Sequence, residues 1–497
     1  MTDQSPARDT DTHAARRERR RALLIGLALF VCYSYFYYFG PNWNVRSHQA
    51  QVVALSEQHT LAIDASHQLT GDKALYRGHY YSDKLLGPSL VAVPVYVAAK
   101  PLVRPFTRSD GRARMVALAI TSVFTSALPT ALLAALFYLF LAELGLAAGL
   151  RAWLALALGF GTLLLPYATA AFGHNLGAVC VGGAFMLLWK QKQEWRTGRG
   201  VAAGALIGLG AICDFTTLFL SAFLGLYALW VASGRGSGRP APLGRLLARI
   251  APVVVIAAAF VGIQLAANWA SFGGPFVFPH VHHVQPAFQA RHTRGLLGVH
   301  LPQLLPLWQL TFGGHRGLFH GSPLLLLALP GFFLLGKRYR AEAIFIAAAW
   351  VGVVLMSSGY ENWEAGSAYG PRYQIPTLPL LLLAVACAAE RWPFVLKGLA
   401  LISTVFMFIV TATTPSVQES LPVPLASAFA AFSVGKLDEQ PNLGMAFGLP
   451  GLLSLLPLLL IEAGLLIWLW ASLRQENAAP TAEATGHKKS PAEKRPR

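Results

Sequence analysis

The chain has 497 residues, of which 55% are hydrophobic and only 13% are charged, and its mean hydropathy is +0.48. This composition leaves too little polar surface for a water-soluble globule of that length, so it predicts a membrane protein. The net charge of +17 does not indicate nucleic-acid binding, because the basic residues gather at the two ends and in short loops without interleaved aromatic residues. We therefore expect membrane lipids as partners, and no nucleic acid.

Apolar runs long enough to cross roughly 30 Å of hydrocarbon recur along the chain. The first, residues 23–38, has no small-residue cleavage site after it, which favours an anchor over a signal peptide. The sequence predicts an all-α integral membrane protein with about twelve transmembrane helices. Their centres are expected near Gly26, Ala131, Leu158, Gly182, Ile207, Ala222, Val255, Leu326, Ala347, Leu380, Val405 and Pro457.

The chain begins and ends in polar, basic segments of low complexity. Residues 1–20 and 475–497 are expected to be disordered tails on either side of one membrane domain, residues 21–474. The positive-inside rule places both tails in the cytoplasm, and we expect the membrane to be a bacterial inner membrane. The same orientation places four polar loops on the outer face: residues 40–84, 269–320, 357–373 and 413–447.

Two apolar segments, residues 86–103 and 201–231, have an ambiguous topology. If each crossed the membrane once, the basic loop between residues 190 and 199 would lie outside, against the positive-inside rule. In the preferred alternative, residues 86–103, which contain three prolines and a lysine, lie along the outer leaflet or dip into it. Residues 201–231 then break near Asp214 into two short helices.

The first outer loop holds the strongest candidates for chemistry, in the stretch GHYYSDKLLGPSL (residues 78–90) and in the GDK that precedes it. A carboxylate there is suited to act as a general base toward an acceptor, and a lysine or arginine is suited to hold a phosphate leaving group. Alternatively, these charges pair with one another in a solvated loop. The candidate bases are Asp83, Asp72 and Asp64, the candidate phosphate ligands are Lys84, Lys73 and Arg46, and His79 and Tyr81 are expected to line a cavity.

The third outer loop, YENWEAGSAYGPRYQIP, offers a further phosphate ligand. Its glycines and proline favour a turn at the membrane edge. Arg372 would bind a phosphate in bidentate fashion, while Tyr369 and Tyr373 pack on an isoprenoid or a sugar. The alternative is an interfacial aromatic belt with a snorkelling arginine.

Polar residues within apolar segments are a weaker signal. His174 and Asn175, in FGHN at a helix boundary, either line a cavity or form structural hydrogen bonds between helices. Asp214 is an acid in apolar surroundings, and the predicted helix break would let it reach an outer cavity.

Metal-ligand patterns are scarce. The run PHVHH contains His280, His282 and His283, but no carboxylate or cysteine stands near it in the sequence, so a surface loop is favoured over a metal site. The four cysteines lie in apolar segments without CxxC spacing and indicate neither a metal site nor a disulfide framework. No metal ligand is assigned and no cofactor is required, although a divalent metal is left open.

The motifs NWNVR, LAID, TGDKA, GHYYSDKLLGPSL, PYATAAFGHN, HRGLFHGSPLLLLALPG and SAYGPRYQIPTLPLL occur in this order between residues 20 and 390. Together they resemble bacterial polytopic glycosyltransferases of the C-type superfamily, such as protein O-mannosyltransferases and the aminoarabinose transferase of lipid A. Each motif is weak alone, and the specificity lies in their order and placement in the loops.

The resemblance implies a large first outer loop that carries helices on the membrane surface. It also implies transfer of a sugar from a polyprenyl-phosphate donor, with inversion, to a glycan, lipid or protein acceptor on the outer face. Asp83 and Lys84 are similar to the acid-amine pair in the Tyr-Phe-Glu-Lys-Pro-Pro stretch of the aminoarabinose transferase. Arg46 is similar to the arginine that follows its first helix.

The chain departs from this family at one functional position. The relatives carry an acid, the expected base, just after the first helix, where residues 42–44 here read Asn-Trp-Asn. An amide cannot accept the proton at neutral pH. The base is therefore expected at Asp83, with Asp72 and then Asp64 as alternatives.

Three other functions remain in competition. The missing acid supports a non-catalytic relative that binds prenyl phosphates. A lipid or solute transporter would be expected to show internal repeats and charges within its helices, whereas the charges here gather in the outer loops. An O-antigen ligase-like enzyme would share the lipid-linked donor but use a different outer loop.

Overall fold

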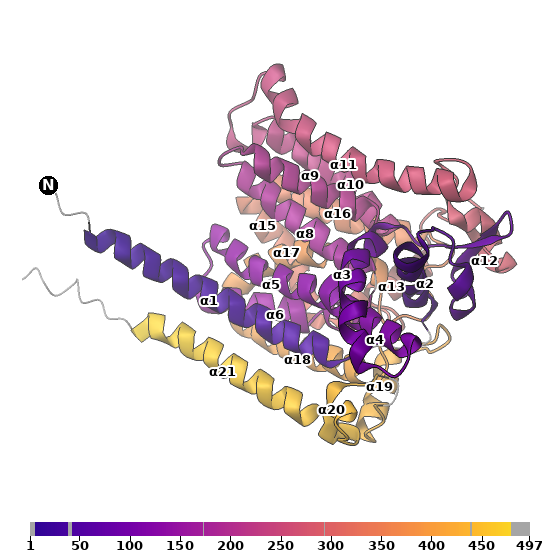
Figure 1. The fold of residues 1–497 in the computed structure, drawn as a ribbon. Coiled ribbons are helices and arrows are strands. Elements are labelled where there is room, and N and C mark those ends of the chain that lie inside the picture. Colours follow the sequence, from indigo (N-terminus) through magenta and orange to yellow (C-terminus); the bar gives the residue numbers. More distant parts are fainter. Residues whose placement is uncertain (1–4, 38–41, 172, 293, 438–439, 479–497) are drawn as a thin grey trace, which may run out of the picture.

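Helices make up nearly all of the regular structure of the protein (Figure 1). The computed structural model describes residues 5–37, 42–171, 173–292, 294–437 and 440–478. Apolar segments of this length fold as helices because a helix satisfies its own backbone hydrogen bonds in hydrocarbon. In the described part of the chain one hairpin departs from the all-α prediction: it pairs β1 (Lys73–Tyr76) with β2 (His79–Ser82).

Seven helical segments among the described residues are long and apolar enough to cross a membrane, so the protein is a helical membrane protein. They contain α4 (Asp110–Ser122) joined through the π-helical turn η4 (Val123–Ala127) to α5 (Leu128–Phe140), then α10 (Phe215–Ala232), α11 (Leu243–Phe272), α16 (Arg340–Ser358), α17 (Leu378–Arg391), α18 (Pro393–Thr413) and α21 (Leu456–Ala478).

Each of these seven segments contains a predicted span centre. The other five predicted centres also lie in helices, but these helices are too short or too polar to count among the seven segments. These helices are α1 (Ser5–Tyr35), α6 (Ala148–Phe160), α8 (Gly173–Gln191), α9 (Thr197–Ala211) and the 3-10 turn η8 (Pro323–Leu327), which leads into α15 (Ala328–Arg338).

The two ends of the described chain lie on the same side of the helices. Figure 1 shows the first residues of α1 and the last residues of α21 close to one edge of the molecule. Short elements gather at the opposite edge, and we call this region the loop layer. It comprises α2 (Trp43–Val53), the hairpin, α12 (Pro286–His292), α13 (Leu304–Thr311), α14 (Leu318–Gly321), α19 (Pro424–Ser433) and α20 (Leu443–Ala446).

The N-terminal segment differs from its prediction. Helix α1 begins at Ser5, so residues 5–20, which were expected to be a disordered tail, are helical. Charge pairing explains part of this extension, because Glu18 lies 2.8 Å from Arg21 of the same helix and 2.8 Å from Arg151 of α6. Of the predicted C-terminal tail, residues 475–478 continue α21, and residues 479–497 lie outside the described residues.

The predicted break in residues 201–231 is confirmed. Helix α9 ends at Ala211 and α10 begins at Phe215, where the Asp214 carboxylate caps α10 by accepting a hydrogen bond of 2.9 Å from Thr217 N. The segment after Lys84 forms α3 (Gly87–Val103), which packs against α2 and α4 and is not one of the seven spans. Gly87 N at its start donates to Ile212 O at the break, at 2.8 Å.

The hairpin fixes which loop residues face each other. Arg77 and Gly78 have positive φ angles of 51° and 85°, as the tight turns that match strand twist require. Lys73 then pairs with Ser82. One step further along this antiparallel register, Asp72 stands opposite Asp83. The hairpin was not predicted from the sequence, because each strand is only four residues long.

The contact between Gly87 and the α9–α10 break yields the first prediction. A Cβ at Gly87 would lie 2.5 Å from Ile212 O, a backbone atom that cannot move independently. We expect Gly87→Ala to lower stability by about 1–3 kcal/mol. The matched control is Gly111→Ala in α4, where a Cβ meets no atom within 4 Å. Thermal unfolding in detergent should separate the two variants, and equal melting temperatures would contradict this packing.

Candidate active site

The candidate site is centred on Lys84, whose ammonium group lies between two carboxylates. Lys84 Nζ is 2.7 Å from Asp72 Oδ2 and 3.1 Å from Asp83 Oδ2. Burial opposes the charge on Lys84, but the two carboxylates outweigh this effect and raise its pKa. Lys84 is therefore a cation at neutral pH, and its charge is neutralised locally.

Helix α2 holds the open end of the hairpin beside Lys84. Ser47 Oγ donates to the Asp72 carbonyl at 2.6 Å and lies 2.8 Å from Ser82 Oγ. Ser82 Oγ in turn accepts a hydrogen bond of 3.1 Å from Lys84 N. These contacts fix the backbones that carry both carboxylates.

The second outer loop brings His283 to the same point. A bridge between Ala74 and His283, and a hydrogen bond of 3.1 Å from Val284 N to Lys73 O, attach this loop to the hairpin. His283 Nε2 then lies 3.7 Å from Asp83 Oδ2. The sequence placed no carboxylate near PHVHH, and the fold supplies one from a segment about two hundred residues earlier in the chain.

This grouping is chemically able to hold a divalent cation. One ligand atom from each of Asp72, Asp83 and His283 can be chosen so that all three lie within 4.8 Å of one another. Carboxylate oxygens with an imidazole nitrogen suit several divalent metals. Lys84 already contacts both carboxylates, so a metal ion would have to displace its ammonium group.

The third outer loop contributes Arg372 and Tyr373. The Arg372 side chain is buried and acts electrostatically on Lys84. Its guanidinium carbon lies 5.7 Å from the centre of the Tyr373 ring. Tyr373 also packs edge-on against Tyr360 and against His174. His174 thus belongs to the site, and its Nδ1 lies 3.3 Å from Asp214 Oδ2.

His48 of α2 also belongs to the site, although no role was predicted for it from the sequence. It is 5% exposed, and its Nδ1 has no hydrogen-bond partner. Burial, helped by the charge on Lys84, lowers the pKa of His48 to about 3. His292 was also missed: it donates to or accepts from the Tyr360 hydroxyl. No spacing in the sequence links these residues, because the fold alone brings them together.

Several predicted site residues of the first loop lie elsewhere. Asp64 and His79 form a partly exposed pair at 2.7 Å. The Lys73 ammonium donates to a backbone carbonyl in the 3-10 turn η2 (Asp64–Leu69), and Tyr81 packs edge-on against Phe272. In the described part of the chain no side-chain contact joins any of these four residues to Lys84. The phosphate-binding role of Lys73 and the cavity-lining roles of His79 and Tyr81 stay predictions.

Three further predicted residues have other surroundings. The Asn175 amide donates to Thr130 Oγ1 and to Leu164 O, each at 3.2 Å. Of the two predicted roles, cavity lining and structural hydrogen bonding, these contacts match the second. Tyr369 is buried in the helical core rather than in a cavity. Arg46 lies partly buried on α2, the helix that carries His48.

Asn42 begins the segment after the first helix, where the resemblance implied an acid. Asn42 caps α2 by accepting a hydrogen bond of 3.0 Å from Asn44 N. The Asn42 amide also donates to Ser367 O at 3.0 Å, which ties α2 to the third outer loop. An aspartate could accept the capping hydrogen bond but could not donate to Ser367 O, since a carboxylate has no N–H.

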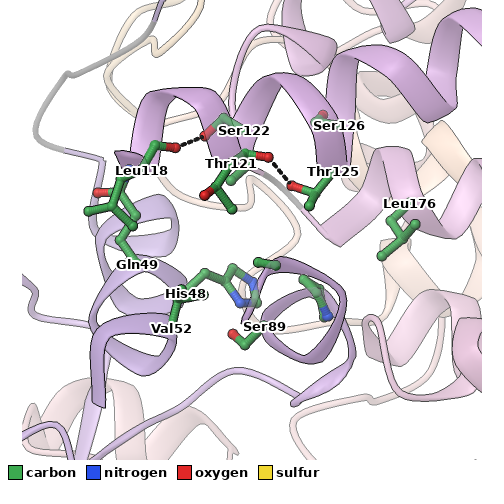
Figure 2. A pocket seen from close by; sticks show the side chains of 13 residues that line it. His48, Gln49, Val52, Ser89, Leu118, Thr121, Ser122, Thr125, Ser126 and Leu176 are labelled. Carbon is green, nitrogen blue, oxygen red and sulfur yellow. Dashed lines mark hydrogen bonds between the residues drawn. The ribbon is translucent and has the colours of Figure 1, made fainter. Parts of the chain in front are cut away.

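A groove opens beside His48, between α2, α3, the α4–η4 segment and α8 (Figure 2). Figure 2 shows His48 and Ser89 on one wall and Thr121 and Thr125 on the other. The threonine hydroxyls donate to carbonyls one turn earlier in their own helix, at 2.7 Å each. Because those hydroxyls are satisfied, the groove presents mainly apolar surface, to which Val52, Ala92, Leu118 and Leu176 contribute.

No protein-family model matches the chain. No curated protein matches it either. The function is therefore inferred from the geometry and chemistry of the site.

The low pKa of His48 predicts a pH dependence. The unfolded chain takes up a proton at His48 as the pH falls below about 6.5, while the folded chain resists it until about pH 3. The free energy of unfolding therefore falls as the pH is lowered through this interval. Between pH 6.5 and 5, the His48→Gln variant should lose about 2 kcal/mol less of its free energy of unfolding than the wild type.

Thermal unfolding in detergent, measured across this pH range, checks the expectation. His13→Gln is the control, because His13 is exposed on α1 and should leave the pH profile unchanged. An unchanged profile for His48→Gln would mean that His48 is not buried in its neutral form.

Proposed function

We propose that this protein is an inverting membrane glycosyltransferase that moves a sugar from a polyprenyl-phosphate donor to an acceptor on the outer face of the membrane. The carrying observation is the position of Lys84, whose ammonium lies 2.7 Å from Asp72 and 3.1 Å from Asp83, with the buried Arg372 nearby. Cations of this kind stabilise a departing phosphate, and carboxylates accept protons from an acceptor.

The reaction is a single displacement. A carboxylate takes the proton of the acceptor hydroxyl as its oxygen attacks the anomeric carbon. The bond from that carbon to the phosphate oxygen breaks, and its electron pair leaves with the polyprenyl phosphate. Lys84 and Arg372 stabilise the negative charge that develops on the phosphate.

Accessibility favours Asp72 as the base. Its side chain is 19% exposed, whereas that of Asp83 is 0% exposed, so an acceptor reaches Asp72 without a rearrangement. Asp83, which the sequence placed first, then holds Lys84 and faces His283. Asp64 is set aside because it pairs with His79 away from Lys84.

The groove beside His48 is suited to the hydrocarbon part of the donor. Its lining is mainly apolar, which suits a hydrocarbon chain. His48 lines the groove and lies within electrostatic range of Lys84 and Asp72. A prenyl chain in the groove would thus place its phosphate toward Lys84.

The membrane arrangement completes the proposal. We propose that about twelve helices cross a bacterial inner membrane, with both termini in the cytoplasm. The loop layer then faces outward, and α2 and α3 lie at the membrane surface. The acceptor is a glycan, a lipid or a protein. If a divalent metal takes part, Asp72, Asp83 and His283 are the residues that would hold it.

A non-catalytic protein that binds prenyl phosphates is the second candidate. Asn42, which caps α2 where an acid was expected, is the observation that favours it. Such a protein would bind the donor through the same cations without transferring the sugar.

Transfer of labelled sugar from a synthetic polyprenyl-phosphate donor to extracted envelope acceptors tests the proposal. Asp72→Asn should reduce transfer by about 10²–10⁴-fold, while donor binding changes little. Asp64→Asn, which removes a nearby loop carboxylate outside the Lys84 group, should retain transfer.

Three results would contradict parts of this account. Loss of transfer in Asp83→Asn alone would move the base to Asp83. Loss in Asp64→Asn would show that the wrong carboxylates were chosen. Wild-type protein that binds the donor but transfers nothing would identify the non-catalytic alternative.

A further inference from the structure

Arg316 is a buried cation with no role in the mechanism above. It precedes α14 in the loop layer and is 1% exposed. Its Nη2 donates to Gly366 O at 3.1 Å, while its Nε and Nη1 are buried without hydrogen-bond partners. An arginine stays charged in proteins, and a buried charge without a counter-ion is strongly unfavourable. The position therefore calls for an anion.

Arg372 stands close to Arg316 and shares this property. Its Nε is also buried without a partner. Arg316 Nη2 donates to Gly366 O at 3.1 Å and the Tyr167 hydroxyl donates to Tyr369 O at 3.0 Å, so both side chains lie against the loop that leads into Arg372. The two guanidinium groups also act electrostatically on each other.

The acids around Arg316 do not neutralise it. Glu364 and Glu419 lie within electrostatic range. In the described part of the chain, however, neither carboxylate forms an ion pair with Arg316, and Glu364 lies 3.9 Å from His315 Nε2 instead. Of the cations Lys84, Arg372 and Arg316, only Lys84 has a carboxylate ion-pair partner among the described residues.

We infer that Arg316 binds a phosphate group of the substrate, beside the phosphate that Lys84 and Arg372 stabilise. The inference rests on the proposed function and extends it, because one phosphate at Lys84 would leave Arg316 unsatisfied. Guanidinium groups suit this task, since each presents two parallel N–H donors to phosphate oxygens. The phosphate is either the second one of a prenyl diphosphate donor or a phosphate on the acceptor.

Binding of synthetic polyprenyl monophosphate and diphosphate to the full-length protein in detergent tests the donor source. Wild type should bind the diphosphate roughly 10- to 100-fold more tightly, as charge-assisted hydrogen bonds allow. Arg316→Gln should abolish this preference and leave monophosphate binding unchanged. A second experiment tests whether the phosphate belongs to the acceptor. In the presence of saturating polyprenyl monophosphate, the wild type should bind phosphatidic acid and Arg316→Gln should not. Either pattern supports the site and names its source.

The controls separate binding from folding. Arg316→Lys keeps the charge with fewer donors and should give an intermediate preference, while Arg294→Gln replaces an exposed arginine of the second outer loop and should match the wild type. If Arg316 only ties its loop to Gly366, Arg316→Gln will lower the melting temperature without changing either selectivity, which overturns the inference. Wild type that binds neither prenyl phosphate would contradict the proposed donor itself.

Discussion

The arrangement of this protein depends on one partly buried group of charges, the Lys84 ammonium between Asp72 and Asp83. Taking three charges out of water costs more than their attraction alone returns, unless hydrogen bonds complete the group. The hairpin and Ser47 supply the rigid backbone that holds the two carboxylates at 2.7 and 3.1 Å from the amine. A group of paired charges adds little to the stability of a fold. Its presence in the loop layer of a helical membrane protein therefore favours a functional role.

Near this group two buried guanidinium cations have no carboxylate ion-pair partner in the described part of the chain. Lys84 has two carboxylate partners, whereas Arg372 and Arg316 retain buried N–H groups without partners. An excess of buried donors is the complement of an anionic ligand, just as an apolar groove is the complement of a hydrocarbon chain. The two features meet at His48, which lines the groove and responds to the charge on Lys84. A lipid phosphate combines both requirements in one molecule.

The sequence indicated part of this arrangement. Apolar runs predicted the helices, because hydrocarbon leaves few alternatives for the backbone, and Asp214 marked the break between α9 and α10. The SDK motif pointed to Asp83 and Lys84. The contributions of His48, His283 and Arg316 were not predictable, because no spacing in the sequence relates them to Lys84. The packing of α2 brings in His48, the bridge to Ala74 brings in His283, and a hydrogen bond to Gly366 O holds Arg316. Asp64, His79 and Lys73 resembled site residues in composition, but local contacts in the loop hold them elsewhere.

The central claim is that Lys84 and Arg372 receive a lipid phosphate. Its most direct test is an electron cryomicroscopy structure of the full chain in a lipid nanodisc with a polyprenyl monophosphate bound. The account predicts that the phosphate lies in contact with Lys84 and Arg372, with the first isoprene units in the groove beside His48. A phosphate bound on another face of the helices, or a lipid chain that avoids the groove, would contradict it.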